Sequence, residues 1–157
     1  WTVGKRLLQH ERSSIGGIGG AQKTTSIEEY AKQYIGLDDQ GKVDDAVLRS
    51  QILSHRMNDS AFALTMKRSV QESATGTAPG AVSSMFKYYG TEQNKGKYEL
   101  LLSILGTQSL GWGGDAFNDD ELTTTRAWLR SKANSIEGGT SEVQLNILAK
   151  RVLALPE

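Results

Sequence analysis

Two short stretches of the sequence combine residue types that could do chemistry. The first is "IEGGTSEVQ" at residues 136–144, which places two glycines directly before Thr-Ser-Glu and a final apolar run. Backbone amides at the start of a helix, together with the positive end of its dipole, bind phosphate or carbonyl oxygens. The simpler alternative is an ordinary helix start, in which Ser141 and Gln144 form a capping box.

The second stretch is "QHER", which places Glu11 directly before Arg12. A carboxylate that is partly removed from water has a raised pKa and can take a weakly acidic proton near neutral pH. On a solvated helix, the same two residues form only a surface pair of little energetic value. Spacing alone favours the surface pair, so a chemical role for Glu11 needs a further argument.

Composition excludes several other classes of site. The chain has no cysteine, which removes disulfides, thiolate nucleophiles and cysteine-based zinc sites. His10 and His55 lack a ligand-like spacing, and we therefore expect no metal. The 18 basic residues balance the 18 acidic ones, which gives no reason to expect a nucleic-acid partner. No apolar stretch approaches the ~20 residues that cross a bilayer, so we expect no membrane partner and a cytoplasmic location.

The elements that must position these stretches are helices. Apolar residues recur at three- and four-residue spacing along most of the chain, and proline occurs only at Pro79 and Pro156. This pattern predicts an all-α protein, an up-and-down bundle of about four to six helices. The expected helical tracts cover residues 2–35, 44–74, 81–105, 121–134 and 141–153.

Two boundaries of these tracts carry specific expectations. Asp44 and Asp45 are favourable at the start of the second tract, and Asp119 or Asp120 could cap the fourth. The glycine-rich segment at residues 106–120 is long enough to be a functional loop.

Both ends of the chain resemble the acyl-CoA dehydrogenase family. The pieces that carry the resemblance are "WTVGKRLLQHERSSIGGIGG" and "SIEGGTSEVQLNILAKRVLALPE". Family members commonly end with Ile-x-Gly-Gly-Thr-Ser-Glu-x-Gln and then Arg-Val-Leu-x-Leu-Pro. The resemblance implies that residues 1–157 form the C-terminal, four-helix-bundle-like domain. The family's N-terminal helical and middle β domains are absent from this sequence, whose first methionine is Met57, and we therefore expect a longer protein.

The resemblance also implies an activity. Members of the family dehydrogenate acyl-CoA thioesters between the α and β carbons: a glutamate removes the α-proton and FAD accepts the β-hydrogen as hydride. An electron-transfer flavoprotein or a similar acceptor would then reoxidise the cofactor, and the enzyme would be a homodimer or homotetramer. Because the missing domains form the other walls of the site, we expect the isolated domain to be inactive.

Individual roles follow from the match to the family's motifs. Many members carry the base at the position of Gly138, whereas a second branch places it on the first helix of this domain, directly before an arginine. The second pattern makes Glu11 the implied base and Arg12 a substrate-binding residue. The backbone amide of Gly138 would bind the thioester oxygen as an oxyanion donor, and Gly139 would contact substrate. The residues implied to contact FAD are Thr140, Ser141 and Glu142.

Two segments depart from the family pattern. An Arg-x-x-Phe-Gly that binds FAD across a subunit contact is replaced by "LDDQGKVDDAVLRSQ", and a Gly-Gly-x-Gly becomes "GTQSLGWGG". Both would hold the nucleotide part of FAD. A divergent bacterial branch has a similar pattern, and some of its members act as unlike pairs with one FAD-deficient partner. The alternative function is therefore a non-catalytic helical assembly domain or an FAD-deficient subunit of a heteromeric acyl-CoA dehydrogenase.

Overall fold

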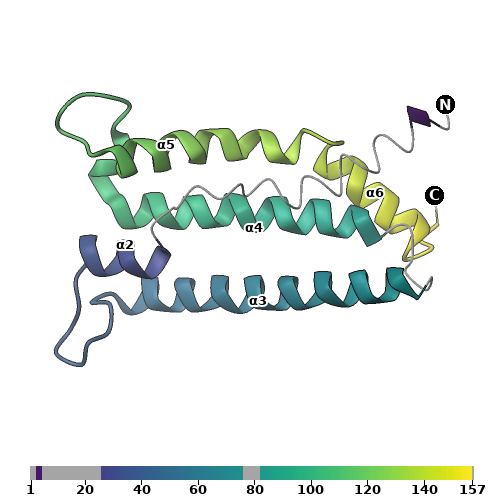
Figure 1. The fold of residues 1–157 in the computed structure, drawn as a ribbon, viewed down its shortest axis with the longest axis horizontal. Helices are drawn as coiled ribbons and strands as arrows, with labels where there is room; N and C mark the ends of the chain where they lie inside the picture. Colours follow the sequence, from purple (N-terminus) through teal and green to yellow (C-terminus); the bar gives the residue numbers. More distant parts are fainter. Residues whose placement is uncertain (1–2, 5–25, 76–81, 157) are drawn as a thin grey trace. The chain divides into compact units, whose positions relative to one another are not determined.

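The computed structural model describes residues 3–4, 26–75 and 82–156, and over these ranges the protein is all-α (Figure 1). An isolated β-bridge between Leu37 and Val43 is the one extended pairing within them. The elements are α2 (Ile27–Tyr34), α3 (Ala46–Ala74), α4 (Val82–Leu105), α5 (Asp119–Lys132) and α6 (Ser141–Arg151), with short 3-10 helices η1 (Gly106–Leu110) and η2 (Ala133–Ser135). The predicted all-α helical class is confirmed.

The predicted helix boundaries agree closely with the structure wherever they can be compared. α3, α4 and α6 begin within two residues of their expected starts, and Leu105 ends α4 directly before Gly106 as expected. Asp45 accepts a hydrogen bond from the backbone N–H of Leu48 at 2.9 Å, which satisfies a free amide at the start of α3. Of the first predicted tract, residues 3–4 and 26–35 lie in the described ranges; they include the helical Val3 and Gly4 and all of α2.

The cap of α5 differs from the prediction. Asn118, and neither Asp119 nor Asp120, forms the cap: its side-chain oxygen accepts from Glu121 N at 2.9 Å. The Glu121 carboxylate in turn accepts from Asn118 N at 2.8 Å, which completes a reciprocal capping box. Asp119 and Asp120 are the first helical residues, where their charge complements the helix dipole.

The described chain packs as two compact units. The first, called here the core unit, contains residues 26–59 and 93–132, which include α2, the first part of α3, the last part of α4, and α5. The second, called here the α6 unit, contains the rest of α3 and α4 together with η2 and α6. Within the described ranges, no helix is both long enough and apolar enough to cross a membrane.

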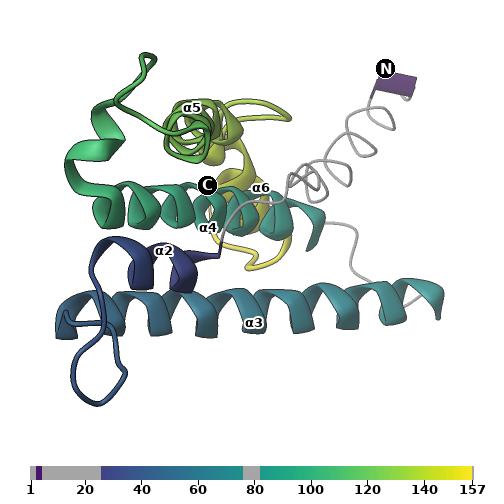
Figure 2. The same ribbon diagram turned by 60° about the vertical axis from the view of Figure 1, so that its left-hand side comes forward.

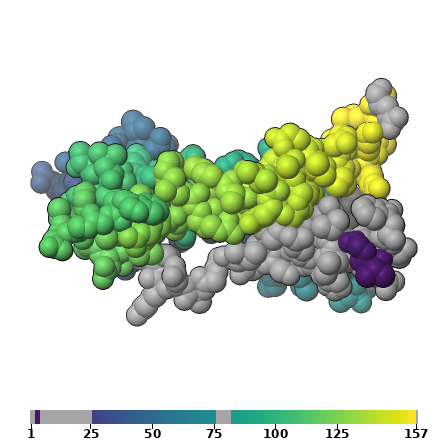
Figure 3. Space-filling model, turned by 90° about the horizontal axis from the view of Figure 1, so that it is seen from above, coloured from purple at the N-terminus to yellow at the C-terminus, as the bar shows by residue number. Residues whose placement is uncertain are grey.

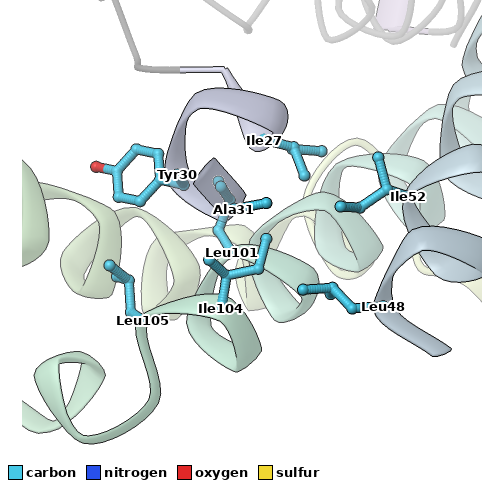
Figure 4. Packing of buried hydrophobic residues seen from close by; sticks show 8 residues of the cluster. All are labelled: Ile27, Tyr30, Ala31, Leu48, Ile52, Leu101, Ile104 and Leu105. Carbon is cyan, nitrogen blue, oxygen red and sulfur yellow. The ribbon is translucent and has the colours of Figure 1, made fainter. Parts of the chain in front are cut away.

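The hydrophobic cluster of the core unit forms around α2. Figures 1 and 2 show α2 between the first part of α3 and the last part of α4. Ala31, at 0% exposure, allows this close approach because its side chain is small. Each buried isoleucine or leucine stabilises the fold by roughly 1.5–3 kcal/mol. Figure 4 shows the cluster: Ile27, Tyr30, Ala31, Leu48, Ile52, Leu101, Ile104 and Leu105.

α5 is attached to the core unit through polar contacts. The hydroxyls of Tyr30 and Thr124 lie 3.0 Å apart, in hydrogen-bond contact, and Lys132 donates to Glu99 of α4 at 2.6 Å. Thr125 donates to the backbone oxygen of Ser109 in η1 at 3.1 Å, so α5 runs back along α4. In the space-filling view of Figure 3, α5 and the segment before it lie on the face that is turned to the viewer, coloured green to yellow-green.

In the α6 unit, α3 and α4 approach each other through aromatic rings. Phe62 packs edge-on against Phe86, with ring centres 5.9 Å apart, and lies 5.4 Å from the ring of Tyr89. The Phe62 ring also lies over Gly90, where an added Cβ would come within 3.1 Å of it. Glycine at position 90 therefore makes room for an aromatic contact between the two helices.

Candidate functional site

The turn between η2 and α6 forms because two consecutive glycines adopt a left-handed backbone. Gly138 has φ 65° and Gly139 has φ 93°, backbone angles that residues other than glycine seldom adopt. Before them, the N–H groups of Ile136 and Glu137 both donate to the backbone oxygen of Ala133, at 2.9 and 3.0 Å, and close the end of η2. The sequence "EGG" therefore stops one helical segment and reverses the chain for the next.

The side chain of Gln144 holds this turn. Gln144 has 0% exposure, and its amide nitrogen donates to the backbone oxygens of Gly138 at 3.1 Å and Gly139 at 3.3 Å. The predicted capping box between Ser141 and Gln144 is therefore wrong. Thr140 is the cap, with its side chain accepting from Val143 N at 3.4 Å, and Gln144 reaches back past the cap to the glycines.

Two buried polar atoms at this helix start have no hydrogen-bond partner among the residues that the structure describes. They are the hydroxyl of Ser141, the first residue of α6, and the side-chain oxygen Oε1 of Gln144. Leaving such a group buried and unpaired costs about 1–3 kcal/mol. Since they lie beside the N-terminal amides of α6, this region combines free acceptor capacity with the positive end of a helix dipole.

The structure brings five of the predicted site residues together in one turn. Gly138 and Gly139 form the bend, Thr140 caps α6, and Ser141 and the exposed Glu142 begin the helix. Glu11 and Arg12 lie outside the described residues, so the structure does not position the predicted base or its neighbour.

The side chain of Glu137 takes part in the turn. Its carboxylate accepts a hydrogen bond from the side-chain amide of Asn134, three residues earlier in η2. This contact ties the end of η2 to the residue directly before the glycines.

The segment in the core unit that replaces Arg-x-x-Phe-Gly is a closed acidic loop. Asp38 accepts hydrogen bonds from the backbone N–H groups of Lys42 at 2.8 Å and Gln40 at 2.9 Å, and these contacts hold its pKa below the usual value. Arg49 donates to the backbone oxygen of Val43 and lies 3.7 Å from the Asp38 carboxylate. The guanidinium of Arg49 is thus already engaged within the loop.

A pocket of about 300 Å³ lies in the same unit. Beside it, Glu121 is only 3% exposed and accepts a hydrogen bond from the Tyr34 hydroxyl at 2.7 Å. Burial and this hydrogen bond raise the pKa of Tyr34 above its usual value. The α5 N-terminus, which follows the glycine-rich loop, carries its own carboxylates where a phosphate would otherwise bind. The pocket is lined by Tyr30, Gln33, Tyr34, Asn118, Asp119 and Asp120.

Sequence reasoning missed several polar residues that the fold buries. The spacing of Gln144 from Ser141 fits a cap, and only the positive φ values of the glycines explain its actual partners. On α4, three buried polar residues at helical spacing, Ser84, Lys87 and Thr91, form a stripe in the α6 unit. Their three- and four-residue spacing is the signal that could have found them. Among the described residues, no group of three acidic or histidine side chains is placed to hold a metal ion.

Comparison with known proteins defines the family. A family model described as the C-terminal domain of acyl-CoA dehydrogenase matches residues 1–153, and the chain therefore belongs to this family. Two curated relatives are acyl-CoA dehydrogenases named IpdE1, from Mycolicibacterium smegmatis and Mycobacterium tuberculosis. Each is 26% identical over 99% of this chain. The chain spans 37% and 38% of their respective lengths, so it corresponds to just over a third of each.

A solved structure has the same fold. It is the ChsE4-ChsE5 complex from Mycobacterium tuberculosis, which matches 83% of this chain and 35% of the solved one with a TM-score of 0.65. At 22% sequence identity, this likeness concerns the helical fold.

The family implies FAD, and the residues at the start of α6 fit such a group. A buried hydroxyl and a buried amide oxygen without partners can exchange hydrogen bonds with a polar ring edge, and the helix dipole favours electron-rich oxygen or nitrogen. Thr140, Ser141 and Gln144 are the side chains that the structure places there.

Proposed function

We propose that this chain is the C-terminal domain of an FAD-dependent acyl-CoA dehydrogenase that introduces a double bond between the α and β carbons of an acyl-CoA thioester. One observation carries the proposal beyond family membership. The Gly138–Gly139 turn places buried, unpartnered polar atoms of Ser141 and Gln144 at the N-terminus of α6, inside the motif that carries the family resemblance. FAD would supply the two-electron acceptor, which no side chain of this protein can replace.

The residues of this chain divide the remaining work. Glu11 would remove the α-proton as general base, and Arg12 beside it would bind substrate. Negative charge then develops on the thioester oxygen, and the backbone N–H of Gly138 would donate to that oxygen. Gly139 would contact the substrate. Thr140, Ser141 and Glu142 would contact the cofactor.

Cofactor binding and bleaching test this proposal in the full-length protein. The purified protein, reconstituted with FAD, is expected to turn yellow and to lose its colour when an acyl-CoA substrate is added without oxygen. Glu11→Gln removes the base, so it should abolish bleaching while FAD remains bound. Glu72→Gln, which changes a glutamate of α3 that is paired with Arg68, serves as the matched control and should bleach normally.

Two results would contradict these assignments. A full-length protein that is colourless after reconstitution and removal of the unbound FAD is not a flavin dehydrogenase. Unchanged bleaching in Glu11→Gln would show that another group removes the proton.

A second candidate function is a subunit of an unlike pair that lacks a complete FAD site of its own. The observation that favours it is the acidic character of the core unit, where the nucleotide part of FAD is expected. Asp38 closes one loop on itself, and Asp119 and Asp120 occupy the positive end of α5. A pyrophosphate would meet carboxylates in both places, which is electrostatically unfavourable.

A further inference from the structure

In the core unit, α3 and α4 meet along a line of apolar residues, called here the seam. Leu48 and Ile52 of α3 belong to the same buried cluster as Leu101 and Ile104 of α4 (Figure 4). Residues three or four apart lie on one face of a helix, so each helix contributes one face to the seam. Because α3 and α4 run in opposite directions (Figure 1), a step forward along α3 matches a step backward along α4.

The next positions of the seam are occupied by His55 and Lys97. His55 follows Ile52 by three residues on α3, and Lys97 precedes Leu101 by four residues on α4. Both residues are half-buried, and they interact electrostatically. The ammonium group of Lys97 also lies 5.6 Å from the centre of the Tyr98 ring. Two residues that can both carry positive charge therefore stand where the seam would otherwise continue with apolar side chains.

The other charged groups that face His55 come from α2 and α3. The Glu28 carboxylate of α2 lies 3.3 Å from Nε of Arg56, and Asp59 follows His55 by one turn of α3. Together with Lys97 of α4, the surroundings of the imidazole contain two acidic and two basic groups. A proton on His55 would therefore add a positive charge to surroundings that are already balanced.

Burial and these charges determine the pH at which His55 takes up a proton. Burial is the largest cause that lowers the pKa of His55 below its usual value; Asp59 and Glu28 oppose the lowering, and Lys97 and Arg56 add to it. The unfolded chain therefore binds this proton at a higher pH than the folded chain does. The stability that neutral His55 preserves is present above pH 6.5, the usual value for histidine, and is lost progressively below it.

We propose that this seam is an acid-sensitive contact of the core unit: protonation of His55 places a second cation beside Lys97 and loosens the packing of α3 against α2 and α4. Neutral His55 fits the seam because it adds no charge to the groups around it. Once protonated, His55 must either move toward water or face Lys97 across the seam. The inference does not rest on the proposed function, in which neither residue binds substrate or cofactor.

Hydrogen exchange of the full-length protein measures this loosening locally. After correction for the intrinsic pH dependence of exchange, protection of the peptide that covers residues 46–59 should fall several-fold between about pH 8 and pH 5. His55→Gln removes the titrating group and should abolish most of this loss. Lys97→Gln removes the facing cation and should reduce the loss. Lys67→Gln, the same change at an exposed lysine of α3, is the matched control and should behave like wild type.

Two results would overturn the inference. The first is wild-type protection that stays constant over this pH range. The second is a loss that persists in full in His55→Gln, which would assign the effect to another group. If His55→Gln does not fold, the comparison of Lys97→Gln with Lys67→Gln decides, since an equal loss in these two variants would exclude the seam. FAD binding tests the proposed function separately, and its result leaves this measurement unaffected.

Discussion

At the scale of single residues, the candidate site depends on polar atoms that folding leaves without partners. Ser141 is the clearest case, because its hydroxyl is buried and unpaired while its neighbour Thr140 performs the capping. Ser141→Ala should therefore leave the apoprotein as stable as before, or slightly more stable, since it removes an unsatisfied group. Thr140→Ala should cost about 1 kcal/mol by removing the cap.

Ser141→Ala should also weaken FAD binding, so that stability is kept while affinity falls. Urea unfolding of the apoprotein measures its stability, and titration with FAD measures its affinity for the cofactor. If Ser141→Ala destabilised the apoprotein as much as Thr140→Ala and left FAD affinity unchanged, the hydroxyl would be structural and its place in the site would be wrong.

Tyr34 offers a second prediction at this scale. Tyr34→Phe removes the donor to the buried Glu121 carboxylate and should cost about 1–3 kcal/mol, whereas Tyr30→Phe loses the contact of two neutral hydroxyls with Thr124 and should cost about 0.5–1.5 kcal/mol. Because burial raises the pKa of Tyr34 above that of a tyrosine in the unfolded chain, the unfolded chain releases this proton at a lower pH than the folded one does. Stability should therefore fall as the pH rises above 10.

Urea unfolding at several pH values measures both effects. Tyr34→Phe should show a shallower loss of stability above pH 10 than wild type, though not a flat one, because burial also raises the pKa of Tyr98. An unchanged alkaline slope would mean that Tyr34 is not the group responsible.

At the scale of elements, the conformation of the loop between η1 and α5 depends on an aromatic ring that packs against its backbone. Phe117 packs on Gly111, where an added Cβ would lie 2.5 Å from the ring. Gly111→Ala should therefore destabilise the protein by about 1–3 kcal/mol through overpacking. Gly113→Ala is the matched control: no atom lies within 4 Å of its added Cβ, and the change should stay within about 0.5 kcal/mol.

Differential urea unfolding of these two variants checks the prediction. Equal stabilities would indicate that Phe117 does not hold this loop in solution.

The helices also show how much of the fold could be predicted from the sequence. Helical periodicity predicted α3, α4 and α6 to within two residues at their starts, because long amphipathic patterns bounded by glycine or aspartate leave few alternatives. The caps could not be predicted as well. Asn118 and Asp119, or Thr140 and Ser141, are adjacent residues of similar capping propensity, and the choice between them depends on backbone angles that only the folded turn fixes.

The candidate site shows the same limit. The family motif predicts a site at residues 138–142, but the partners of Gln144 follow from the left-handed glycines before α6, which spacing does not encode.

At the scale of the whole molecule, the carboxylates of the core unit affect how FAD could bind in a homo-oligomer. In the family pattern, the segments at residues 37–51 and 106–114 would hold the nucleotide part of FAD, the first of them across a subunit contact. If the protein is a homo-oligomer, every copy carries these carboxylates, and the pyrophosphate of FAD therefore approaches them. Asp39 and Asp119 are both exposed, so neutralising them should leave the fold intact.

We accordingly expect the full-length Asp39→Asn, Asp119→Asn double variant to bind FAD several-fold more tightly than wild type in dilute buffer. Salt should reduce the difference, since exposed charges are screened over about 10 Å at 0.1 M ionic strength. FAD titration at two salt concentrations measures this effect, and the flavin released on denaturation should equal one per chain. Unchanged affinity, together with one FAD for every two chains of an unlike pair, would contradict the homo-oligomer, because the nucleotide would then be held by a different chain with a more basic surface.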